Sequence, residues 1–209
     1  MSAAIEFDQA SHSYRVGGAP VPSVTTILRG ALQFAGVPED VMTAALQRGT
    51  AVHKAVELDS LGTLDEDTVD PRVAPYLKRW REFVAATGYR SLAAELPCAS
   101  ARFGYAGTLD QLGEFRGRAD RTVLLDVKTS VALPPSVGPQ TAAYASAVVE
   151  SYGPGTDAAF RLPNRKIDRY VLLLGALRYK LVPLDDPADI AVFCSAVTLW
   201  RWCRANRIA

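Results

Sequence analysis

The longest apolar run of the chain, residues 170–177, constrains the fold more than any other feature. A strand that is apolar at nearly every position has to be covered on both faces. Such strands lie inside sheets that carry helices on both sides, as in α/β proteins. We therefore expect a buried strand over residues 169–177, and a tight turn at residues 175–178 that leads into a neighbouring strand over residues 179–184.

The remaining segments alternate between helical and strand-like patterns. Helical spacing of apolar residues predicts helices over residues 38–59, 71–87, 139–151 and 187–204. Shorter alternating segments predict strands over residues 92–99, 106–115 and 122–128. Gly49 interrupts the first helical pattern, which indicates either a close approach of another backbone or a break between two helices.

We expect one domain over residues 1–209. Residues 1–40 are an extension, in which a hairpin leads into residues 23–28, either a strand or the capped start of a helix. Residues 41–184 form the core, and residues 185–209 a C-terminal helix. No apolar run approaches the ~20 residues that span a bilayer, and residues 1–9 lack a secretory pattern. These observations predict a cytoplasmic protein with no membrane partner.

Two acidic residues and a lysine are the candidates for a metal-binding catalytic site. Side chains of a strand alternate between its two faces. On the strand over residues 122–128, Asp126 and Lys128 are two positions apart, so their side chains project from one face about 6.6 Å apart. If residues 113–121 form a hairpin connection, Asp110 reaches the same point from the adjacent strand. Carboxylates about 4 Å apart repel by roughly 4 kcal/mol at an effective dielectric of about 20, and a divalent cation turns this repulsion into binding.

The expected ligands are the side chains of Asp110 and Asp126 and the carbonyl of Val127, a set of oxygen atoms that suits Mg²⁺ or Mn²⁺. Beside the metal, Lys128 would orient or deprotonate the attacking water and neutralise charge on a phosphate. The structural alternative is that Asp126 and Lys128 form an ordinary ion pair at the end of a sheet and that Asp110 is a turn residue.

Two polar pairs at helical spacing accompany these residues. His53 and Glu57 share a face of the first helix, and Gln140 and Tyr144 share a face of the helix after the Asp126 strand. In isolation each pair is more typical of a helix surface. Taken together, the two pairs show that each helix next to the acidic strands has two polar residues on one of its faces.

The combination resembles the RecB-like branch of the PD-(D/E)xK nucleases. The resemblance rests on Gly49, His53 and Glu57, on GYAGTLD at residues 104–110, on LDVKTS at residues 125–130, and on QTAAYA at residues 140–145. It implies an α/β fold with a three-layer, restriction-endonuclease-like αβββαβ core, a mixed central sheet and flanking helices. It implies metal ligands at Asp110 and Asp126 and a catalytic lysine at Lys128.

The resemblance also implies roles for residues that the spacing alone does not settle. His53 would be a further metal ligand or would shape the site, and Gln140 and Tyr144 would help to place the substrate or Lys128. Glu57 and Glu95 match positions where relatives often carry acids, and are expected to support the ligands. Some relatives bind an iron–sulfur cluster through four cysteines. Cys98, Cys194 and Cys203 are too few and wrongly placed, so no cluster is expected.

The function expected from this resemblance is hydrolysis of DNA phosphodiester bonds with Mg²⁺ or Mn²⁺, by an exonuclease that processes DNA ends in recombination or replication. An endonuclease or junction resolvase would use the same residues. A non-catalytic nucleic-acid-binding subunit of the same fold is a further alternative, although such proteins usually lose a ligand or the lysine. The partners expected are DNA and a helicase, single-strand-binding or recombination protein, with the oligomeric state left open.

The C-terminal quarter offers a candidate contact for DNA. Residues 160–209 hold nine basic and four acidic residues, whereas the whole chain has a formal net charge of +1. Arg201 and Arg204 lie one helical turn apart and would follow a phosphate backbone. Solvated charges at a helix end explain the same pattern.

Overall fold

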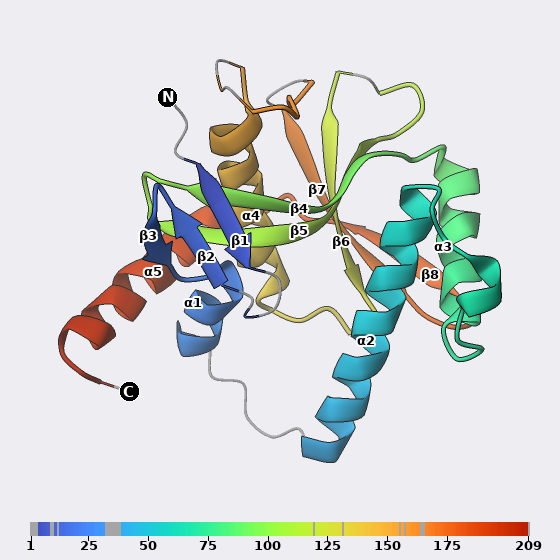
Figure 1. The fold of residues 1–209 in the computed structure, drawn as a ribbon, viewed down its shortest axis with the longest axis horizontal. Coiled ribbons are helices and arrows are strands. Elements are labelled where there is room, and N and C mark those ends of the chain that lie inside the picture. The colour runs from blue at the N-terminus through green and yellow to red at the C-terminus, as the bar shows by residue number, and fades with distance from the viewer. Residues whose placement is uncertain are drawn as a thin grey trace.

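The computed structural model of the chain describes residues 4–8, 11, 13–31, 39–118, 120–130, 132–154, 156, 158–163 and 166–208, without the side chains of residues 39–46. Its centre is a mixed sheet in the strand order β4-β5-β6-β7-β8 (Figure 1). The strands are Arg90–Ser100, Tyr105–Glu114, Thr122–Lys128, Ile167–Leu174 and Tyr179–Pro183. Only β6 and β7 are parallel, and the other neighbours are antiparallel. This confirms the expected α/β class with a mixed sheet.

Helices cover both faces of this sheet. The helices α1, α4 and α5 share one buried cluster with Leu124 of β6, whereas α2 and α3 share the other with Val123 and Leu125. Consecutive residues of β6 thus point to opposite layers, as strand geometry requires. On β7, Leu172 and Leu174 are fully buried, which confirms the strand expected from the longest apolar run. The helices are Val24–Ala31 (α1), Glu39–Ser60 (α2), Ala74–Thr87 (α3), Val137–Tyr152 (α4) and Asp189–Ala205 (α5).

The N-terminal residues form a second, smaller sheet. It consists of β1 (Ile5–Asp8), β2 (Ser13–Val16) and β3 (Ala19–Val21), all antiparallel. Tyr14 packs this sheet against β4 and β5, and its hydroxyl lies 2.9 Å from Thr108 Oγ1. Of the two alternatives for residues 23–28, the helix is the one that forms. Ser23 Oγ accepts a hydrogen bond from the Thr26 N–H at its start.

Two expected boundaries are wrong, because a turn forms at the end of the expected strand and at the start of the expected helix. The expected strand over residues 169–177 ends at Leu174, where the Gly175 N–H donates to the Arg178 carbonyl. The helix expected from residue 71 begins at Ala74, after a turn in which the Val73 N–H donates to the Asp70 carbonyl. The loop before it, residues 61–70, holds a short 3-10 helix, Glu66–Thr68. Pro38, the expected start of α2, lies outside the described residues.

The helix α2 runs without a break through Gly49, so the alternative of two separate helices is wrong. A Cβ atom at Gly49 would lie 3.6 Å from Thr129 Oγ1. The helix therefore passes beside the C-terminal end of β6, in ordinary van der Waals contact. This passage brings the next turn of α2, which carries His53, to the end of the sheet.

Contacts around Arg169 fix the start of α4 relative to β7 and α5. Its guanidinium donates to the Gly138 carbonyl at 2.8 Å and pairs with the Asp189 carboxylate at 2.9 Å.

Among the described residues, no helix has both the length and the apolar character needed to cross a membrane. Cys98 is buried, whereas Cys194 and Cys203 are only half-buried on α5.

Candidate metal centre

The two aspartates lie where β5 and β6 separate. The two strands pair from Gly113↔Val123 to Gln111↔Leu125, and the next residues in this register are Asp110 and Asp126. Beyond this point β5 continues to pair with β4. One carboxylate oxygen of Asp110 accepts a hydrogen bond of 2.7 Å from the Val127 N–H, which holds this side chain against β6.

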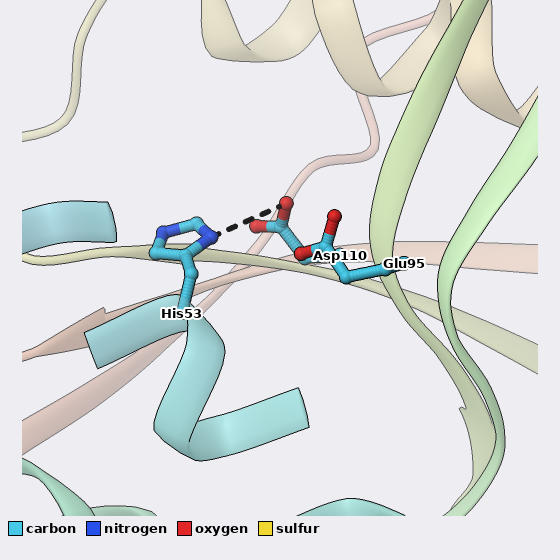
Figure 2. Close-up of side chains that lie close together, drawn as sticks. All are labelled: His53, Glu95 and Asp110. Carbon is cyan, nitrogen blue, oxygen red and sulfur yellow. Dashed lines mark ion pairs between the residues drawn. The ribbon is translucent and has the colours of Figure 1, made fainter. Parts of the chain in front are cut away.

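His53, Glu95 and Asp110 come together from three elements. Each offers one ligand atom, and these atoms lie within 4.8 Å of one another. Figure 2 shows the imidazole and the Glu95 carboxylate on either side of the Asp110 carboxylate. His53 Nδ1 lies 3.5 Å from Asp110 Oδ1. Two carboxylates and an imidazole at this spacing are a donor set that suits a divalent cation.

The backbone of β4 is unusual at Glu95. The neighbouring pairs Ala94↔Gln111 and Leu96↔Leu109 place Glu95 opposite Asp110. Its φ angle is +47°, in the left-handed region that a residue with a side chain rarely adopts. This conformation costs about 1 to 2 kcal/mol, and such strained residues cluster at functional sites. The strain at this position therefore supports a functional role for the Glu95 carboxylate.

Asp126 and Lys128 form a second part of the site. Asp126 is 2% exposed, and its Oδ2 lies 2.6 Å from Lys128 Nζ. The contact has the distance of an ion pair, but it leaves this buried oxygen without a well-formed hydrogen bond among the described residues. A buried carboxylate oxygen with spare acceptor capacity is suited to a metal ion.

Two acids of the site, Glu95 and Asp126, have raised pKa values, mainly because they are buried. Burial, together with the charge of Asp110, raises the pKa of Glu95 to about 7 and that of Asp126 to about 6. Burial alone would lower the pKa of His53, but the Asp110 carboxylate outweighs it and raises the pKa to about 9. The pKa of Lys128 is also raised, because Asp126 and Asp110 outweigh its burial. Protons thus supply positive charge that a bound cation would supply instead.

The helix α4 brings Gln140 and Tyr144 to the same region. Gln140 Nε2 donates to the Tyr144 hydroxyl at 3.3 Å. Burial raises the pKa of Tyr144 well above its usual value, and the charges of Asp110 and Asp126 add to this effect. The tyrosine ring lies directly against β5. A Cβ atom at Gly107 would be 2.5 Å from Tyr144 Cε1, so this close approach requires glycine.

Other residues considered from the sequence have different surroundings. Glu57 pairs with Lys54 at 2.8 Å, and its charge contributes to the raised pKa of Glu95. Arg201 donates to the Phe103 carbonyl at 2.6 Å, and Arg204 lies over the Trp200 ring at 5.0 Å. Both arginines are on α5, which packs in the buried cluster on one face of the sheet, whereas α2 packs in the cluster on the other face. The structure does not bring these arginines to the carboxylates.

Sequence reasoning assigned Glu95 only a supporting role, whereas its carboxylate lies among the atoms that could hold a metal. The signal available was an acid inside the apolar strand pattern of residues 92–99. Sequence reasoning also did not indicate that the Val127 N–H donates to Asp110; the Val127 carbonyl as a metal ligand stays a prediction.

No model of a known protein family matches the chain, and no curated protein matches it. Acidic oxygens and an imidazole can hold a divalent cation, while a lysine ammonium beside them can contact an anionic substrate.

Proposed function

We propose that the chain is a metal-dependent deoxyribonuclease of the PD-(D/E)xK type, with a restriction-endonuclease-like αβββαβ core. The observation that carries this proposal is the convergence of Asp110, Asp126 and Lys128 where β5 and β6 separate. The order α2 and α3, β4 to β6, α4 and β7 supports it, because the RecB-like nucleases that the motifs resemble share this order. DNA as substrate and action on DNA ends follow from the same resemblance.

In this proposal Asp110, Asp126, His53 and Glu95 would hold Mg²⁺ or Mn²⁺. The bound ion supplies Lewis-acid polarisation of the phosphate and lowers the pKa of the attacking water. Lys128 contributes a positive charge and three N–H donors beside Asp126, and these neutralise and position a phosphate oxygen. Tyr144 and Gln140, joined by a hydrogen bond, would help to place the substrate or Lys128, so that the reacting groups keep a fixed geometry.

The proposal is tested by incubating the protein with linear, nicked and closed-circular DNA, in the presence of Mg²⁺, Mn²⁺ or EDTA. We expect metal-dependent degradation of linear DNA, with closed circles left intact. Cleavage of closed circles would instead identify an endonuclease that uses the same residues. If no form of DNA is cut under any metal condition, the stand-alone nuclease is wrong and the binding subunit remains.

Glu95 gives a direct test of the metal centre. The Glu95→Gln substitution removes one charged ligand, and we expect it to weaken Mn²⁺ affinity by about tenfold or more in calorimetric titrations. The matched control is Glu57→Gln on α2, which removes a nearby acid that is paired with Lys54. Its expected effect is only a few-fold. Equal losses in the two variants would show that general negative charge, rather than ligation by Glu95, accounts for the binding.

A further inference from the structure

The C-terminal helix α5 has an apolar face on the side away from the core. Phe193 and Val197 are buried against α1 and α4. On the opposite side of the helix Val192 is 44% exposed, Leu199 is 46% exposed and Trp202 is 55% exposed. Single exposed apolar residues are common, but three aligned on one helix face mark a contact surface.

The spacing of this face is that of a helix that packs against another helix. Its positions alternate at steps of four and three residues and are all exposed: Ala188, Val192, Ser195, Leu199, Trp202 and Asn206. We call these six residues the α5 seam. Alternating steps of three and four define the a and d positions of a coiled coil, and no charged side chain occupies the seam. A second helix could therefore bury it without desolvating a charge.

We propose that a second copy of the chain covers the α5 seam, with the two α5 helices antiparallel about a twofold axis. The seam is self-complementary in this direction. Val192 lies opposite Trp202 of the second copy, and Ser195 lies opposite Leu199. At both ends of the contact the bulky Trp202 thus packs against the smaller Val192. In the centre, the small Ser195 packs against Leu199. Each pairing occurs twice, as a closed twofold interface requires.

Charge at the helix ends selects the antiparallel direction. Asp185 and Asp186 precede α5, and Arg204 and Arg207 lie at its end. Antiparallel packing brings the acidic end of one helix to the basic end of the other, and also places the helix dipoles head to tail. Parallel packing would bring like charges together. Charge complementarity therefore favours a second copy of this chain as the occupant.

The contact is small, and the metal centre lies outside it. A single pair of five-turn helices buries less than the roughly 1,600 Å² of a standard interface, so we expect a dissociation constant of about 1 to 100 µM. The seam faces away from the core on α5, whereas α2, which carries His53, belongs to the buried cluster on the opposite face of the sheet. Each copy would keep its carboxylates accessible to substrate.

The test is the mass of the intact protein in solution, measured by sedimentation velocity over concentrations that bracket this range. We expect a monomer–dimer equilibrium, and at least a tenfold weaker association for Leu199→Glu and Trp202→Glu. The matched control is Leu177→Glu, at an 89% exposed site on the β7–β8 turn, which should leave association unchanged. A wild-type protein that remains monomeric throughout overturns the proposal, as does equal disruption by Leu177→Glu.

Cross-linking tests the direction of packing. In a chain with Cys194→Ser and Cys203→Ser, the pair Ser195→Cys and Leu199→Cys should form a covalent dimer on mild oxidation, while Ser195→Cys alone should not. Efficient cross-linking by Ser195→Cys alone would indicate parallel packing and overturn the proposal.

If Leu199→Glu lowers the melting temperature without changing the mass, another part of the same chain covers the seam. If Trp202→Glu weakens DNA binding without changing the mass, the seam contacts DNA. Either outcome overturns the dimer.

Discussion

Replacing Lys128 with alanine is expected to slow metal-dependent DNA cleavage by about a thousandfold while preserving Mn²⁺ binding. Lys128 Nζ lies 2.6 Å from Asp126 Oδ2, so its charge is held beside the carboxylates without being a metal ligand itself. Its side chain is 23% exposed, which leaves it open to contact with substrate. The substitution should therefore lower the reaction rate without lowering the affinity for the metal.

Single-turnover cleavage at saturating Mn²⁺, together with calorimetric Mn²⁺ titration, separates the two effects. Lys54→Ala is the matched control, because Lys54 is also near the site but pairs with Glu57 on the surface of α2. It should retain cleavage within a few-fold. Activity of Lys128→Ala close to that of the wild type would mean that Asp126 and Lys128 form only a structural ion pair.

Folding has to be checked in the same experiment, because Lys128→Ala leaves the buried Asp126 without its cation. Removing one partner of a buried ion pair can cost about 3 to 5 kcal/mol. Lys128→Gln retains an N–H donor and should be less destabilised, yet it should remain about as inactive as Lys128→Ala. Melting temperatures with and without Mn²⁺ would show whether the bound ion restores the lost stability.

Gly107→Ala is expected to lower the free energy of unfolding by about 2 to 3 kcal/mol. The added Cβ would lie 2.5 Å from Tyr144 Cε1, and the ring is buried and cannot move into solvent. Either β5 or α4 has to shift, and both carry residues of the proposed site. The same substitution should therefore also reduce cleavage. Urea denaturation measures the stability change, and cleavage of linear DNA measures the second effect.

Gly49→Ala provides the contrast for this prediction. Its Cβ would lie 3.6 Å from Thr129 Oγ1, an ordinary contact, and alanine inside a helix is favoured over glycine by about 0.5 to 1 kcal/mol. We expect unchanged or slightly increased stability. Tyr144→Leu should cost less in the Gly107→Ala background than alone, because the clash disappears with the ring. Additive costs would show that the ring is not the obstacle.

Local patterns were sufficient to predict most elements of the sheet. The strand over residues 122–128 has the expected bounds, because its alternation and apolar content reflect burial between two layers. The boundaries at residues 71 and 177 were wrong because turn hydrogen bonds ended these elements, and apolar spacing does not report such bonds. Gly49 left two alternatives open, and only the structure shows that one helix runs through it.

The sequence alone determined the approximate positions of the five strands of the main sheet and of most helices, and which strand carries an aspartate and a lysine on one face. Only the tertiary structure decided that Glu95 meets Asp110 and His53, and that the outer face of α5 is left exposed. The physical reason is the range of the interactions involved. Periodicity is set by residues within a few positions of one another, whereas the β4–β5 register and the packing of α5 depend on contacts between segments far apart in the chain.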